Sequence, residues 1–179
     1  MRFESTDLAG LVVVHPERHV DERGFFVRTF CEAEFAGEKL ETRFPQTSLS
    51  FNARAGTVRG MHYQRSPHAE IKLVRCSRGA VHDVVVDLRP DEPTFLQWRG
   101  FDLSAENGVA LYIPEGFAHG FQTLVDETEV SYLITPSFVT GRSAGVRWND
   151  PKIAINWPLP ISVISDNDTM WPLLTSGAT

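Results

Sequence analysis

The sequence predicts an all-β protein, either a sandwich or a closed barrel, with only a few short helices. Short runs rich in β-branched and aromatic residues recur at near-regular spacing along the 179 residues. The 13 glycines and 11 prolines lie between these runs as turn signals and are not gathered into a linker. No low-complexity segment or clear internal repeat is found. We therefore expect a single domain spanning residues 1–179.

The expected strands follow one another along the chain, and turn signals bound them. Pro16 closes the first β-branched run, and Ser77-Arg78-Gly79 forms a loop of hairpin length between two longer runs. The predicted strands are residues 11–15, 23–30, 71–76, 80–88, 96–103, 109–113, 120–124 and 129–135. The best helix candidate is residues 32–40, where Gly37 weakens the helical pattern.

Alternation within residues 80–88 divides the side chains between two faces of the predicted sheet. One face carries Val81, Asp83, Val85 and Asp87, and the other carries His82, Val84, Val86 and Leu88. Many short strands separated by turns are typical of sandwiches and barrels, and the jelly roll is one such solution.

Composition narrows the classes of function. The net charge of -6 argues against a nucleic-acid partner, which needs a basic face, but leaves room for a local cationic site. Two cysteines are too few for a secreted disulfide framework and indicate a reducing compartment. The N-terminal sequence MRFESTDLAG lacks the apolar run of a signal peptide, and no stretch is long and apolar enough to cross a membrane. We expect a cytoplasmic protein that binds neither nucleic acid nor membrane.

Two histidines stand in a pattern that resembles the cupin motifs. Residues 108–119 have the spacing G-x5-P-x-G-x2-H, which ends at His119 and resembles the second cupin motif. The opening of the first motif fits Gly56-x5-His62, but Gln64 stands where a second histidine ligand would be. A metal site normally needs three protein ligands, and glutamine is a poor ligand for transition metals. The expectation is a cupin-like jelly-roll barrel without a metal.

Longer motifs resemble one family, the dTDP-4-dehydrorhamnose 3,5-epimerases. They are residues 56–64, 72–75, 83–89, 113–121 and 147–151, together with Trp157-Pro158, and the similarity extends from about residue 21 to residue 174. The resemblance implies an isomerase on a cupin barrel, usually dimeric, with no cofactor. Such an enzyme inverts the carbons that flank the ketone of a nucleotide-linked 4-keto-6-deoxy sugar, at C3, C5 or both, in deoxysugar biosynthesis.

The resemblance assigns four catalytic residues, and the chemistry explains their types. His62 matches the base that removes a proton beside the ketone, since imidazole titrates near neutral pH. Asp168 matches the carboxylate that orients this base, with Asp83 as the reserve candidate. Lys72 matches the ammonium that stabilises the enolate, and Tyr132 matches the proton donor on the opposite face.

The remaining matches concern substrate binding. Arg23, which the resemblance places in the partner subunit's cavity, and Arg59 match residues that contact the diphosphate, and guanidinium groups suit phosphate oxygens. The other binding candidates are Phe26 and Phe138 at the base, Gln46 and Ser48 in the nucleotide pocket, and His119 at the substrate.

The departures from the family pattern gather at this nucleotide end. Arg28 stands where glutamate is usual, which reverses a charge beside the base. Ser48 replaces asparagine, Ser143 replaces glutamate, Asn167 replaces lysine and Phe138 replaces tyrosine. The sequence therefore leaves the base open among thymine, cytosine and guanine, and it does not identify the final sugar.

Three other functions remain open at this stage. A metal-dependent cupin oxygenase would bind iron, manganese or zinc, and Gln64 in the ligand position argues against it. A non-catalytic sugar-nucleotide binding module would need Arg23 and Arg59 but would have no use for His62 with Tyr132. A keto-sugar isomerase on the same barrel would move the carbonyl group instead of inverting a centre. Seen singly, each histidine could also be a core residue satisfied by hydrogen bonds.

Overall fold

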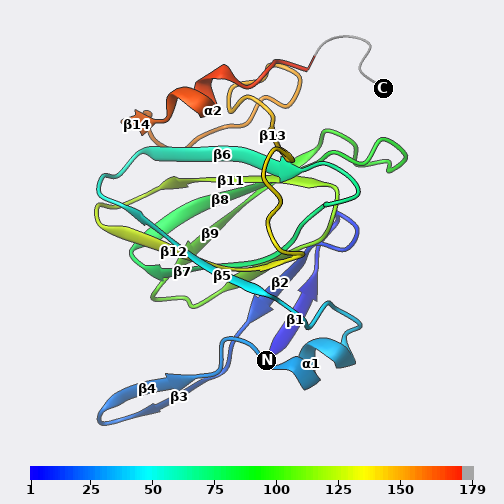
Figure 1. Ribbon diagram of the computed structural model, residues 1–179. Coiled ribbons are helices and arrows are strands. Elements are labelled where there is room, and N and C mark those ends of the chain that lie inside the picture. Colours follow the sequence, from blue (N-terminus) through cyan, green and yellow to red (C-terminus); the bar gives the residue numbers. More distant parts are fainter. Residues whose placement is uncertain (175–179) are drawn as a thin grey trace.

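The computed structural model describes residues 1–174, which form two sheets packed face to face as a jelly-roll barrel (Figure 1). The first sheet contains, in spatial order, β1 (Arg2–Ser5), β2 (Val12–His15), β10 (Ala110–Ile113), β7 (Ile71–Arg78), β12 (Thr128–Thr135) and β5 (Gln46–Asn52). The second contains β13 (Ser143–Gly145), β6 (Thr57–Gln64), β11 (Phe117–Thr123), β8 (Ala80–Asp87) and β9 (Trp98–Ser104), with β14 (Val163–Ile164) parallel to β6. The predicted all-β cupin-like fold is confirmed.

Apolar side chains fill the barrel between the sheets and also cover the outer face of the second sheet. Val81 and Val85 of β8 belong to the central core with Leu111 of β10. Val84 and Val86, which alternate with them, pack on the other face against the C-terminal segment. Figure 1 shows this segment and the short helix α2 (Asp166–Met170) lying over β6. The division of faces predicted for residues 80–88 is therefore correct.

The short helix α1 (Glu32–Gly37) covers part of the outer face of the first sheet. Its Phe35 is completely buried, and the ring centroids of Phe3 and Phe30 lie 5.1 and 4.9 Å from that of Phe35. The helix was expected to reach residue 40 but ends at Gly37. The helix thus ends at the glycine that weakens the sequence pattern, because glycine is a poor helix former.

A two-stranded hairpin, β3 (Arg18–Asp21) and β4 (Gly24–Val27), projects away from the barrel (Figure 1). The sequence predicted one strand over residues 23–30, and this was wrong in extent because Gly24, with a φ of 122°, follows directly on the turn at residues 22 and 23. The hairpin exposes large apolar side chains: 77% of Val20, 54% of Phe25 and 68% of Phe26. It therefore presents apolar surface that its own barrel does not cover.

The other predicted strands are found with shifted ends. Strand β11 begins at Phe117, three residues earlier than expected, so that it includes His119 as its third residue. Only residues 114–116 separate β10 from β11, and this tight turn leaves more chain for the strand. None of the helices within residues 1–174 is both long and apolar enough to span a membrane.

Candidate active site

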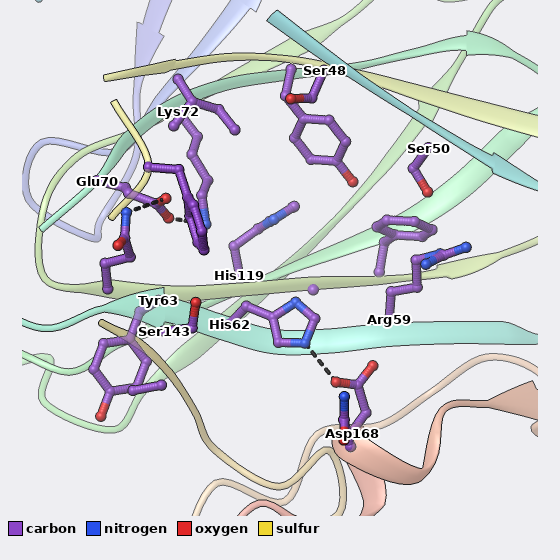
Figure 2. A pocket seen from close by; sticks show the side chains of 18 of the residues that line it. Ser48, Ser50, Arg59, His62, Tyr63, Glu70, Lys72, His119, Ser143 and Asp168 are labelled. Carbon is purple, nitrogen blue, oxygen red and sulfur yellow. Dashed lines mark hydrogen bonds and ion pairs between the residues drawn. The ribbon is translucent and has the colours of Figure 1, made fainter. Parts of the chain in front are cut away.

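A cavity of about 510 Å³ opens between the two sheets, and side chains from both sheets and from α2 line it (Figure 2). The catalytic and substrate-binding candidates that line this cavity are His62, Lys72, Tyr132, Asp168, Ser48, Arg59, His119 and Phe138. His62 and His119 face each other across neighbouring strands β6 and β11, where they are paired in register. Tyr132 comes from β12 in the opposite sheet, so the histidines and the phenol approach one cavity from two sides.

His62 and Asp168 form a hydrogen-bonded pair at the cavity edge (Figure 2). The distance from His62 Nε2 to Asp168 Oδ1 is 2.6 Å. Because a carboxylate only accepts, Nε2 carries the ring proton, and Nδ1 is left as the basic nitrogen. Burial would raise the pKa of Asp168, but the hydrogen bond and charge of His62, with a bond from the Gly60 N–H, lower it below its ordinary value. The carboxylate therefore stays ionised.

Local structure explains how Asp168 reaches this position. Ser165 caps the helix α2, and its Oγ accepts a hydrogen bond from the Asp168 N–H at 3.2 Å. This capping turn aims the carboxylate at β6, where Oδ2 accepts from the Gly60 N–H at 3.2 Å. Trp171 Nε1 donates to Oδ1 at 3.3 Å. Asp-Asn-Asp is typical of an exposed turn, but the side chain of Asp168 is buried.

An irregularity in the pairing of β6 with β11 lies next to the two histidines. The register shifts between His119 and Phe121, so that β6 carries an extra residue there. A Cβ atom at Gly60, whose φ is 128°, would lie 2.6 Å from the Cα of Gly120. Glycine is therefore required for this close approach of the strands, and the bulge turns the Gly60 N–H toward Asp168.

A second imidazole–carboxylate pair lies deeper in the barrel. His119 Nε2 is 2.8 Å from Asp83 Oδ2, and both side chains are buried. Asp83, the reserve partner for His62, is thus the partner of His119 instead. The ring of Tyr132 lies edge-on to that of His119, with centroids 6.2 Å apart. Burial and the charge of Asp83 raise the pKa of Tyr132, although Arg59 opposes them, so the phenol remains protonated at neutral pH.

Lys72 lies on the cavity wall in a small polar network that the sequence analysis did not foresee (Figure 2). Its Nζ is 2.9 Å from Glu70 Oε2, and Gln64 Nε2 donates to Glu70 Oε1 at 2.7 Å. Glu70 could have been suspected from its position two residues before Lys72, because alternate residues of an extended segment share a face. Within residues 1–174, no group of three or more His, Cys, Asp or Glu side chains is arranged to hold a metal ion.

The residues expected at the nucleotide end are only partly brought together. Arg59 lines the cavity, and Asn52 Oδ1 accepts from its Nε at 2.7 Å, which fixes the guanidinium. Gln46 lies outside the lining, but its Oε1 accepts a hydrogen bond from the N–H of Phe138, which is in the lining. Arg23 and Phe26 lie on the projecting hairpin, where Arg23 pairs with Asp21 at 2.6 Å. Neither residue lines the cavity formed by its own chain.

The residues that depart from the family pattern occupy two different places. Arg28 follows the hairpin, is mostly exposed, and lies 3.6 Å from Glu34 of α1. Ser143 and Asn167 line the cavity and bring no charge to it. The charged groups that do line the cavity are Arg59, Glu70, Lys72 and Asp168, beside the imidazoles of His62 and His119.

These features define a class of protein before any comparison is made. A jelly-roll barrel with a paired imidazole, an ammonium and a protonated phenol around one cavity is a cupin-type protein equipped for acid–base chemistry. The groups suit a reaction that removes a proton on one side of a substrate and returns one on the other.

Comparison with known proteins identifies the particular family. The sequence model described as dTDP-4-dehydrorhamnose 3,5-epimerase matches residues 5–176. Proteins of that name from Sinorhizobium fredii and Methanothermobacter thermautotrophicus are 42% and 44% identical, covering 97% and 95% of this chain and 90% and 92% of their own length. The crystal structure of the Bacillus anthracis enzyme with TDP and PPi bound is 41% identical, with a TM-score of 0.94, and covers 97% of this chain and 99% of that one. The chain therefore belongs to the dTDP-4-dehydrorhamnose 3,5-epimerase family, which confirms the resemblance and the isomerase class predicted from sequence.

Proposed function

We propose that this chain epimerises a dTDP-4-keto-6-deoxyhexose at C3 and C5, using His62 as the base and Tyr132 as the opposing acid. The observation that supports this most directly is the 2.6 Å bond between His62 Nε2 and Asp168 in a cavity that Tyr132 also lines. The pair leaves Nδ1 of His62 unprotonated, and a carbon acid beside a ketone needs such a base.

In the first step, Nδ1 of His62 takes the proton from a carbon next to the sugar ketone. The electron pair of the broken C–H bond forms a carbon–carbon double bond, and the carbonyl oxygen becomes an enolate. Asp168 stabilises the imidazolium that results, because its charge lies 2.6 Å from Nε2. The Lys72 ammonium supplies positive charge and hydrogen-bond donors for the enolate oxygen.

In the second step, Tyr132 donates its phenolic proton to the enolate carbon from the opposite sheet. The carbonyl re-forms, and the configuration at that carbon is inverted because the proton arrives on the other face. The raised pKa of Tyr132 keeps the phenol protonated until the enolate forms. Solvent then takes the proton from the His62 imidazolium and returns one to the Tyr132 phenolate, and the same cycle serves the second carbon.

The proposal includes a homodimer in which the hairpin completes the partner's site. Arg23 and Phe26 lie outside their own cavity, on a hairpin that exposes apolar surface. Leu49 and Phe51 of β5, in the first sheet of the same chain, expose 61% and 49% of their surface. An exposed apolar surface of this kind is typical of an interface.

Subunit mixing tests this arrangement. The variants Arg23→Ala and His62→Ala should each be inactive as homodimers, while a mixture that has exchanged subunits should regain activity. In the heterodimer, one cavity combines an intact His62 with an intact Arg23 from the other subunit, and the second cavity lacks both. Random exchange makes about half of the dimers heterodimers, and each has one working site of two. The mixture should therefore show about a quarter of the wild-type activity. If Arg23 acted in its own subunit, mixing would restore nothing.

For the base, we propose thymine, because the Bacillus anthracis relative binds TDP. Arg28 pairs with Glu34 and lies away from the cavity of its own chain. Any effect of its charge on a bound base is therefore exerted in the partner's cavity. Thermal shift with dTDP, CDP and GDP distinguishes the bases, since a ligand that binds only the folded state raises the melting temperature.

We further propose that residues 1–179 form one domain and that the enzyme works in the cytoplasm. Limited proteolysis and cell fractionation test these two points.

Deuterium exchange tests the reaction itself. Wild-type protein in deuterated water should introduce deuterium at C3 and C5 of dTDP-4-keto-6-deoxyglucose, while His62→Ala should introduce none. His15→Ala is the matched control, because His15 pairs with Glu4 on the surface, away from the cavity. Absence of label with the dTDP, CDP and GDP keto sugars would refute the proposed function. Label at only one carbon would limit it to a single centre.

A further inference from the structure

Glu70 is the one carboxylate of the cavity lining that the proposed reaction leaves without a role. Its side chain is 10% exposed, and that of its ion-pair partner Lys72 is 11% exposed. Burying a carboxylate is costly unless it is paired and hydrogen-bonded. Here both oxygens are occupied, since Oε2 meets Lys72 Nζ at 2.9 Å and Oε1 meets Gln64 Nε2 at 2.7 Å (Figure 2).

The position specifically requires a group that only accepts hydrogen bonds. Two donors converge on Glu70, the ammonium of Lys72 and the amide of Gln64. The amide of Gln64 is oriented in turn, because its Oε1 faces the N–H of Val139 at 3.4 Å. Glutamine in place of Glu70 would turn its own NH2 group toward one of these donors. Only an ionised carboxylate accepts from both.

This network fixes the place of the ammonium. A lysine side chain ends in a point charge on a flexible four-carbon stem, so an unpaired ammonium at the edge of a cavity samples several positions. Gln64 is itself buried, and it anchors Glu70 to β6, while Lys72 lies on β7 in the other sheet. The ion pair thus ties the ammonium to a strand of the opposite sheet, which also carries His62.

We propose that Glu70 is a positioning residue that holds the Lys72 ammonium where the enolate oxygen forms. This inference rests on the proposed function, in which Lys72 stabilises the enolate. The carboxylate also offsets part of the ammonium's charge, so the two effects of Glu70 on the rate oppose each other. Positioning is the larger of the two, because a displacement of about 1 Å in a catalytic group can cost roughly 100-fold in rate.

A double-mutant cycle tests whether Glu70 acts through Lys72. Glu70→Gln should lower kcat roughly 10- to 100-fold and change KM little, because the ammonium is needed most at the enolate-like transition state. In the Lys72→Ala background, the same change should have no further effect on kcat. Gln64→Met, which removes the second donor to Glu70 and the acceptor for the Val139 N–H, should give a smaller loss that likewise disappears in the Lys72→Ala background. Glu127→Gln is the control, since it breaks the exposed pair with Arg78.

Each outcome of this cycle supports or refutes the inference. Losses that multiply in the double variant would show that Glu70 supports the fold and not Lys72. A kcat of Glu70→Gln that equals or exceeds that of the wild type would show that charge offset dominates, and it would also refute the inference. Near-native circular dichroism of each variant excludes unfolding as the cause. Failure of the proposed function is distinguishable, because then the wild-type protein itself exchanges no deuterium.

Discussion

Replacing Asp168 by asparagine removes a negative charge from the cavity and keeps the size of the side chain. In the structure, Asp168 accepts hydrogen bonds from three donors: Nε2 of His62, Nε1 of Trp171 and the N–H of Gly60. The first two donors share Oδ1, and the third uses Oδ2. An asparagine must place its NH2 group against at least one of these donors, whichever way the amide turns.

The magnitude follows from these contacts. Loss of one charge-assisted hydrogen bond costs about 1.5–3 kcal/mol, which corresponds to roughly 10- to 150-fold in rate. An asparagine that donates to Nε2 of His62 also moves the ring proton to Nδ1, the atom that must accept the substrate proton. The wrong tautomer in a comparable histidine–aspartate pair lowers kcat by about 10⁴. We therefore expect Asp168→Asn to lower kcat roughly 10³-fold, or about 4 kcal/mol of barrier.

The assay is the initial rate of deuterium uptake into dTDP-4-keto-6-deoxyglucose, followed by NMR at saturating substrate. Asp166→Asn is the matched control, because Asp166 lies on the same helix and is exposed. The control should retain the wild-type rate. An Asp168→Asn protein that is folded and exchanges within threefold of the wild type would refute the assigned role of the His62–Asp168 pair.

Three further results are expected. Tyr132→Phe should still exchange the substrate hydrogen for deuterium through His62, but the deuterium should return to the same face of the sugar. NMR should therefore show labelled substrate of unchanged configuration. Inverted product at the wild-type rate would contradict this. The pKa of Asp168 is lowered by folding, so its contribution to stability is present above its unfolded pKa of about 3.9 and lost as the pH falls through the lower, folded value. Urea titrations of wild type and Asp168→Asn should therefore converge in unfolding free energy below about pH 4, whereas a constant gap would argue against the ionised pair. Leu111→Ala, in the fully buried core, should cost about 2–5 kcal/mol in unfolding free energy in the same titrations, and a loss under 1 kcal/mol would mean that the site repacks.

Residue patterns predicted the barrel because strand alternation and turn residues are local properties. The faces of residues 80–88 needed only neighbouring residues to be recognised. The hairpin expected at Ser77-Arg78-Gly79 was wrong, because the chain passes there from β7 in the first sheet to β8 in the second, and these strands do not pair with each other. The strands β1, β3, β5, β6, β13 and β14 were not predicted. Pairing with distant segments stabilises β5 on β12 and β6 on β11, and tertiary pairing of this kind can override weak local preference.

Resemblance in the motifs selected the residues of the site, but it did not determine how they pair. Asp83 and Asp168 were both candidates for His62, and only the fold assigns one carboxylate to each histidine. The ordered helix that carries Asp168 depends on packing against β6, which a five-residue segment does not reveal. The motifs gave Glu70 no role in the reaction, and the structure makes it the partner of Lys72.

The sequence by itself therefore determined the class of fold, the family and the chemical types of the groups in the cavity, because these depend on local patterns and on the order of motifs. Tertiary structure alone decided which groups meet, which side of the cavity each one faces, and that Arg23 and Phe26 lie outside their own cavity. The physical reason is distance along the chain. His62 and Asp168 are 106 residues apart, and their 2.6 Å contact exists only after two sheets and a short helix have packed together.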